Sequence, residues 1–90
     1  MANHKSALKR IRRNERARVA NRMHITRSRT YVRRAHAAMG GADVEASKEA
    51  VREAIIALDK AASKGVIHKN NASRRKARLM HQLAMLEAQQ

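Results

Sequence analysis

The sequence predicts an all-α fold, a three-helix up-down-up bundle with a long, projecting, basic first helix. The 90-residue chain has no Pro and only three Gly, and it is rich in Ala, Arg, Lys, Leu and Met, the strongest helix formers. The glycines fall at two places, Gly40-Gly41 and Gly65, and so divide the chain into three segments. Because the connections between these segments are short, consecutive helices should be antiparallel.

The first helix is expected from about residue 6 to residue 39. Gly40 and Gly41 then suit a helix C-cap, because Gly adopts the left-handed conformation without a Cβ penalty. Asp43 is the expected N-cap of the second helix, since a carboxylate at that position accepts a hydrogen bond from a free backbone N–H group.

The second helix should end at Gly65, in a Schellman motif with Val66 as its apolar contact. The third helix should start between residues 68 and 71, with Asn70 or Asn71 as its cap. It then continues to the C-terminal region without another Gly.

Apolar residues recur at helical spacing on one side of each expected helix. In the first helix this core stripe holds Ile25, Ser28, Val32, Ala35 and Met39. In the second it holds Val44, Ser47, Val51, Ala54, Ile55, Leu58, Ala61 and Ala62. In the third it holds Ala72, Leu79, Met80, Leu83 and Leu86.

Leu8, Ile11 and Val19 lie on a different side of the first helix from the core stripe. A stripe that changes sides cannot pack against one neighbour throughout. We therefore expect a single domain over 1–90 with two parts, a basic arm (1–22) and a three-helix bundle (23–90). Leu, Ile and Val supply only 15 of the 90 residues, and a content below roughly 20% with high net charge favours disorder. The arm should accordingly be helical mainly when a partner is bound.

The formal charge of +14 is concentrated at the start of the chain. Residues 1–38 hold 12 basic residues and one acidic residue, residues 39–65 have a net charge of −1, and residues 66–90 have a net charge of +4. Self-repulsion on this scale is typical of proteins that bind a polyanion, where release of counterions from phosphates drives association. The arm is the predicted main site, with cations on all sides at Lys5, Lys9, Arg10, Arg12, Arg13, Arg16, Arg18 and Arg22.

Several other functions find little support in the sequence. There is no Cys, and no two of the five His have i,i+4 spacing, so neither a metal site nor a cofactor is expected. Phosphate-binding glycine loops and nucleophile motifs are absent, which argues against an enzyme. A membrane-surface helix would need a continuous apolar side with bulky anchors. The arm offers only Leu8, Ile11 and Val19, and the chain has no Phe or Trp, so this class is disfavoured. Tyr31 is the only aromatic residue, so stacking along a single strand is disfavoured. Composition alone does not separate folded RNA from duplex DNA, and a nucleoid-type DNA-packaging protein remains the alternative.

Two stretches resemble the bacterial small-subunit ribosomal protein S20 family. One is residues 2–12, ANHKSALKRIR, and the other is residues 58–70, LDKAASKGVIHKN, followed by a basic run to residue 80. The similarity extends over nearly the whole chain, including the Gly40-Gly41 turn. The chain departs from the family pattern at His4, Leu8, Asn71, His81 and Gln82.

The resemblance implies a structural protein of the cytoplasmic ribosome that binds folded small-subunit ribosomal RNA directly and stabilises its packing during assembly. It implies a monomer within the ribosome, and it leaves neighbouring ribosomal proteins open as further partners. By position, it assigns RNA contacts in the arm to Asn3, Lys5, Ser6, Lys9, Arg10, Arg12 and Arg13. It assigns a second RNA-contacting surface to His68, Lys69, Asn70, Arg74, Arg75 and Arg78.

Overall fold

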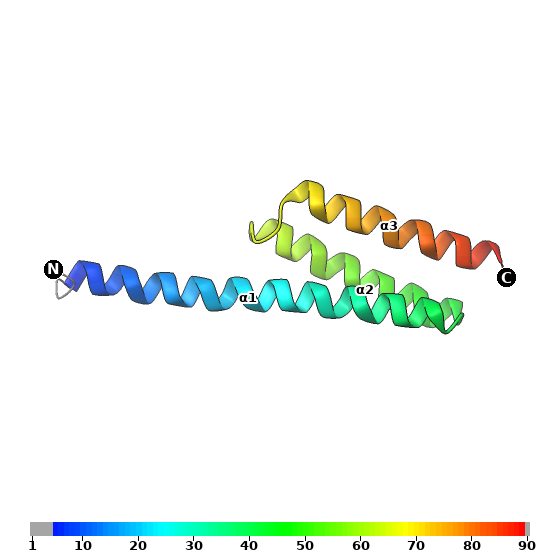
Figure 1. Cartoon of the computed structure of the whole chain (residues 1–90), viewed down its shortest axis with the longest axis horizontal. Coiled ribbons are helices and arrows are strands. Elements are labelled where there is room, and N and C mark those ends of the chain that lie inside the picture. Colours follow the sequence, from blue (N-terminus) through cyan, green and yellow to red (C-terminus); the bar gives the residue numbers. More distant parts are fainter. Residues whose placement is uncertain (1–4, 90) are drawn as a thin grey trace.

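The computed structural model describes residues 5–89, and within that range the chain forms three α-helices and no strand. α1 spans Lys5–Gly40, α2 spans Val44–Ser63 and α3 spans Lys69–Ala88. α2 runs back along the second half of α1, and α3 then runs back along α2 (Figure 1). The predicted all-α, up-down-up arrangement with a long first helix is confirmed.

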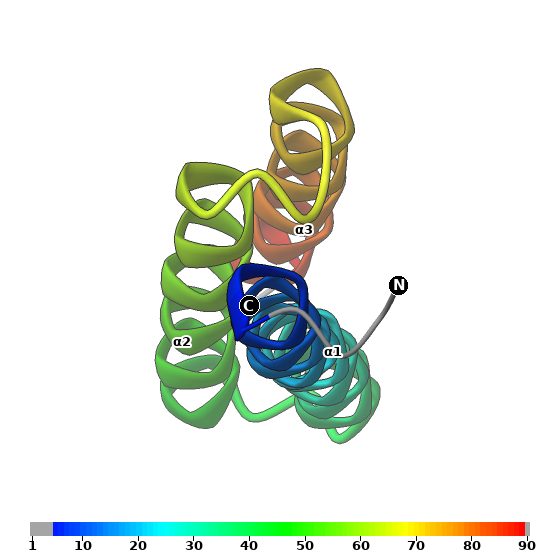
Figure 2. The ribbon, with the colours of Figure 1, turned by 90° about the vertical axis from the view of Figure 1, so that its left-hand side faces the viewer.

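α1 determines the elongated shape of the molecule. Its 36 residues form a helix of about 54 Å at a rise of 1.5 Å per residue, and the longest dimension of the molecule is 65 Å. The radius of gyration is 17.9 Å, whereas a compact domain of this length has about 12 Å. The first half of α1 extends past the ends of α2 and α3 (Figure 1), and every residue from 8 to 23 is exposed. In the view along α1, α2 lies to the left of it and α3 lies above it (Figure 2).

The core is small and lies between the second half of α1 and the other two helices. α2 packs against both α1 and α3, whereas α1 and α3 touch each other much less. The central buried cluster consists of Ala35, Val51, Ala54, Leu58 and Leu79. Alanines at two of these five positions let the helices approach closely, but they leave little apolar area to stabilise the fold.

The predicted core stripes are confirmed with two exceptions. Ala57 is buried although the stripe of the second helix left it out. Met80, predicted in the seam of α3, is 57% exposed. The side of α3 that meets α2 is narrow and is filled by Ala72 and Leu79, so Met80 is turned outwards from the contact.

Two buried serines take part in the core because their hydroxyl groups bond to the helix itself. Ser28 Oγ donates to the carbonyl of Ile25 at 2.8 Å, and Ser47 Oγ donates to the carbonyl of Asp43 at 2.7 Å. This local bond removes the penalty for burying a hydroxyl group. The sequence had placed both serines on the core stripes by spacing alone, and both are buried.

The corner between α1 and α2 differs from the prediction. Gly40 and Gly41 do not adopt the left-handed conformation, and the positive φ of 62° falls at Ala42 instead. α1 continues through Gly40, and the backbone N–H of Gly41 still donates to the carbonyl of Ala37. The reversal therefore comes one residue later than the glycines suggest. Asp43 is the N-cap of α2, as predicted, and its Oδ1 accepts from the Ala46 N–H at 3.2 Å.

The corner between α2 and α3 follows the prediction more closely. Gly65 has a φ of 74°, and its N–H donates to the carbonyl of Ala62 while the Val66 N–H donates to that of Ala61. These two bonds define the expected Schellman motif. The cap of α3 is His68, and neither Asn70 nor Asn71 is the cap.

His68 caps α3 with its imidazole ring. Its Nδ1 accepts from the Asn70 N–H at 3.1 Å, which places the start of the helix inside the predicted interval of residues 68 to 71. An imidazole nitrogen can act as the acceptor that Ser or Asn usually supplies at this position.

Candidate nucleic-acid interface

The described part of the arm is a basic surface with little internal neutralisation. Arg18 pairs with Glu15, with Nη2 and Oε2 separated by 3.0 Å. Both side chains are more than half exposed, so the pair contributes only about 0.3 kcal/mol. Within residues 5–89 the other predicted arm cations make no ion pair: Lys5, Lys9, Arg10, Arg12, Arg13, Arg16 and Arg22.

Two further arm residues, Asn3 and Ser6, are assigned to RNA contacts by the resemblance. Asn3 lies outside the described residues. Ser6 lies in the first turn of α1 and is exposed.

Four arm cations form one row along α1. At 100° per residue, Lys5, Lys9, Arg12 and Arg16 fall within about 60° of one another. Together with Leu8, which is 40% exposed, they line a shallow groove of about 510 Å³. A row of cations at one-turn spacing matches the linear arrangement of phosphates in a nucleic-acid backbone.

The other arm cations point elsewhere. At about 100° per residue, Arg18 lies nearly opposite the row, Arg10 and Arg22 lie about 110–130° from it on its two sides, and Arg13 lies about 70° from it. The arm therefore presents positive charge around its whole circumference, as the sequence predicted.

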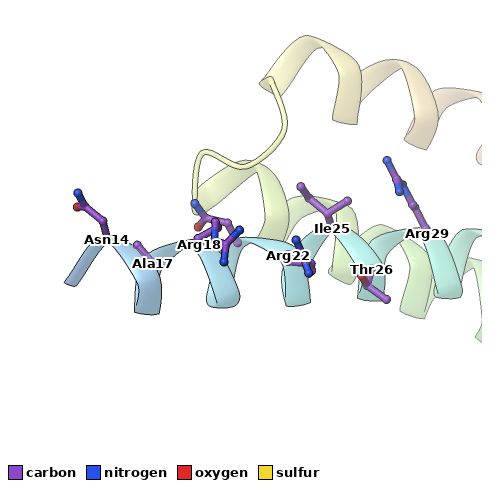
Figure 3. A pocket seen from close by; sticks show the side chains of 8 residues that line it. Asn14, Ala17, Arg18, Arg22, Ile25, Thr26 and Arg29 are labelled. Carbon is purple, nitrogen blue, oxygen red and sulfur yellow. The ribbon is translucent and has the colours of Figure 1, made fainter. Parts of the chain in front are cut away.

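A larger groove lies where α1 leaves the bundle, and we call it the elbow groove. It has a volume of about 580 Å³ and lies on the surface of α1 near the connection between α2 and α3 (Figure 3). Asn14, Ile25 and Arg29 extend from α1 towards the side on which α2 and α3 lie (Figure 3). The groove is lined by Asn14, Ala17, Arg18, Asn21, Arg22, Ile25, Thr26 and Arg29.

The second predicted surface lies in the first half of α3. All six of its residues are exposed: His68, Lys69, Asn70, Arg74, Arg75 and Arg78. Asn70, Arg74 and Arg78 are one turn apart and lie opposite the buried Ala72 and Leu79, so they share the outward side of α3.

Lys69 and Arg75 flank that outward side. Arg75 Nε donates to Asn71 Oδ1 at 2.8 Å, which holds the guanidinium group close to its own helix. Lys69 is the first residue of α3, where the free N–H groups of a helix add positive potential. Lys76 is turned back to α2, with Nζ 2.6 Å from Asp59 Oδ1.

The arm and the second surface lie at the same end of the bundle. The first turns of α3 follow the α2–α3 connection, which lies at the end of the bundle from which α1 projects (Figure 1). The sequence predicted two separate surfaces, and the fold has both of them at this end of the bundle.

The sequence-based set omitted four further exposed cations of α1, namely Arg27, Arg29, Arg33 and Arg34. They contribute to the positive charge of residues 1–38, but they lie beyond residue 22, where the predicted arm ends. Their spacing was the available signal, because Arg27 and Arg34 continue the row of Lys9 and Arg16 on the same side of the helix. The Arg34 guanidinium carbon also lies 5.2 Å from the centre of the Tyr31 ring, in a cation–π contact.

Within residues 5–89, no three His, Asp or Glu side chains are grouped so that they could hold a metal ion. In the same range, none of the three helices is both long enough and apolar enough to cross a bilayer.

Comparison with known proteins identifies the family. The family model described as Ribosomal protein S20 matches residues 2–84. The chain is 50% identical to the small ribosomal subunit protein bS20 of Thermomicrobium roseum over 80 residues, which cover 89% of this chain and 81% of that protein. It is 47% identical to the bS20 of Streptomyces griseus over 88 residues, which cover 98% and 100% of the two chains. The chain therefore belongs to the ribosomal protein S20 family, whose members are non-enzymatic structural components of the cytoplasmic ribosome.

Proposed function

We propose that this protein binds folded small-subunit ribosomal RNA directly and stabilises its packing during assembly of the subunit. The arm of residues 1–22 supplies most of the binding free energy, and the bundle of residues 23–90 fixes the direction in which the arm projects. The protein acts as a monomer within the ribosome, with neighbouring ribosomal proteins as secondary partners.

The observation that carries this proposal is the exposed, unneutralised charge of the arm. Every residue from 8 to 22 is exposed, and Glu15 is the only acidic side chain among them. In proteins that need charge only for solubility, both signs are interspersed. α2 shows that mixed pattern, with Glu45 and Lys48 paired at 3.7 Å.

The like charges of the arm also destabilise its helix until a polyanion is present. Cations at i,i+4 spacing, such as Lys5 with Lys9 and Arg12 with Arg16, each cost about 0.2–0.5 kcal/mol. Phosphates between these side chains convert repulsion into attraction. The arm can thus enter between RNA segments and reduce the repulsion between their backbones.

The bundle contributes by orientation. The second half of α1 is packed against α2 through Ala35 and the buried residues around it, and α1 is one continuous helix. The arm therefore leaves the bundle in a fixed direction. The outward cations of α3, Arg74 and Arg78, provide a second set of phosphate contacts at that end of the bundle.

The test is competition binding at near-physiological salt. Labelled folded small-subunit ribosomal RNA is bound by the full chain, and unlabelled folded RNA, duplex DNA and unstructured RNA of equal length are compared as competitors. The proposal predicts that only the folded RNA competes at low concentration. Equal competition by duplex DNA would mean that charge alone drives binding, and the DNA-packaging alternative would replace the proposal.

A further inference from the structure

The elbow groove contains two exposed amide side chains in an otherwise cationic helix. Asn14 and Asn21 are seven residues apart, or about two turns, so they lie on the same side of α1. The same side of α1, further towards its C-terminal end, is buried in the bundle at Ser28 and Ala35. Ala17 lies between the two amides and keeps the floor of the groove low.

Both asparagines are unfavourable for the free arm. Asn is a poorer helix former than Ala, because its side chain competes for backbone hydrogen bonds. Within residues 5–89 neither amide makes a side-chain hydrogen bond. The folded protein therefore gains nothing from them that would offset this cost.

We infer that the elbow groove binds the minor groove of an RNA helix, with Asn14 and Asn21 hydrogen-bonding to ribose 2′-hydroxyls and base edges. The inference rests on the proposed function and names the part of the RNA that this site contacts. An amide both donates and accepts hydrogen bonds, as does a 2′-hydroxyl, whereas Arg and Lys only donate.

The surroundings of the amides suit the same ligand. Arg18, Arg22 and Arg29 line the groove beside them, where guanidinium groups reach the phosphates that border a minor groove. Thr26 adds a hydroxyl group. At 100° per residue the two amides lie along one side of the groove and the three cations lie along the other, an order that matches ribose and base edges beside one phosphate backbone.

The dimensions of the grooves favour RNA over DNA. An α-helix with its side chains is about 10–12 Å wide, and the minor groove of B-form DNA, at about 6 Å, does not admit it. The minor groove of A-form RNA is wide and shallow and displays the 2′-hydroxyls. Minor-groove contacts by the amides should therefore contribute to affinity for RNA and not for duplex DNA.

The experiment compares the full chain with the double variant Asn14→Ala, Asn21→Ala. Both substitutions favour the helix, so a loss of binding cannot come from unfolding of the arm. Because two neutral hydrogen bonds are lost, we expect affinity for folded small-subunit ribosomal RNA to fall about 10-fold. Affinity for duplex DNA should stay the same, and so should the dependence of RNA affinity on salt, because neutral contacts release no counterions.

Two variants serve as references. Gln82→Ala removes an exposed amide from α3, outside the proposed surfaces, and should leave RNA affinity unchanged. Arg18→Ala should lower RNA affinity and also reduce the salt slope by about one ion.

The inference is overturned if the double variant binds RNA as tightly as the unmodified chain, or if it loses equal affinity for RNA and DNA. Failure of the proposed function has a different signature. In that case the unmodified chain itself shows no preference for folded ribosomal RNA.

Discussion

The two halves of α1 are one continuous helix held by different forces. From residue 25 onwards the helix is stabilised by packing, with Ser28 and Ala35 buried against its neighbours. From residue 8 to residue 23 every side chain is exposed, and an isolated helix of this length is marginal in water. The comparison shows that helix propensity can set a conformation where tertiary packing does not. Under the proposed function, the same helix serves as scaffold at one end and as ligand-binding surface at the other.

The largest expected effect comes from removing the arm. Deletion of residues 2–13 removes five cations, Lys5, Lys9, Arg10, Arg12 and Arg13. With roughly 0.8 kcal/mol for each, at the upper end for exposed ion pairs, RNA affinity should fall about 1,000-fold. The melting temperature of the bundle, followed by circular dichroism, should hardly change. Loss of the bundle together with the arm would show that the two halves do not have separate roles.

A substitution in the core should destabilise the bundle, whereas a similar substitution in the arm should not. Leu58 is 1% exposed in the central cluster, and Leu58→Ala should lower the free energy of unfolding by about 2–5 kcal/mol through lost burial and a cavity. Ile11→Ala is the matched change in the arm, where the side chain is 51% exposed, and should change stability by less than about 0.5 kcal/mol. Denaturant unfolding measures both variants. Similar losses in the two would mean that the arm is packed in solution.

A smaller effect is expected at the caps that shape the bundle. Asp43→Ala removes the acceptor for the Ala46 N–H and should destabilise the bundle by about 1 kcal/mol. Asp43→Asn keeps an acceptor at this position and should retain most of the stability. Equal losses in the two variants, measured by denaturant unfolding, would assign the effect to the charge of Asp43 and not to its capping bond.

The smallest expected effect is that of a single cation. Arg16→Ala should reduce the slope of log affinity against log salt by about 0.7–0.9 if Arg16 contacts one phosphate. Arg52→Ala removes an exposed cation from α2, away from both proposed surfaces, and should leave the slope unchanged. Equal slopes for the Arg16 variant and the unmodified chain would place Arg16 in solvent.

The sequence predicted the bundle well because its signals are local. Helix formers, three glycines and periodic apolar residues define the number of helices. Asp43 marks the start of α2 by its capping side chain, and Gly65 marks its end by its positive φ. The errors occur where tertiary packing decides between local alternatives. Spacing alone assigned Met80 to the seam, but the narrow contact with α2 leaves it exposed.

The corner after α1 shows a second limit of the sequence. Glycine favours a positive φ but does not require it, so the reversal can fall on Ala42 when the geometry of the connection demands it. The cap of α3 was missed for a related reason, since His68 can accept a hydrogen bond as an Asn does.

The proposed binding surface was only partly predictable. Charge density identifies the arm, because a row of cations is visible in the order of residues. The elbow groove could not be predicted from charge, because Asn14 and Asn21 are neutral. Their place in a groove near the α2–α3 connection is known only from the fold.

Hydrogen exchange of the full chain, with and without folded small-subunit ribosomal RNA, tests the central claim most directly. In the free protein, amides of residues 8–22 should exchange fast, while those of the buried stretch of α2 around Leu58 should be protected. Addition of RNA should protect residues 8–22 strongly and change α2 little. Arm amides that are already as protected as those of α2 in the free protein, and that do not respond to RNA, would contradict the account.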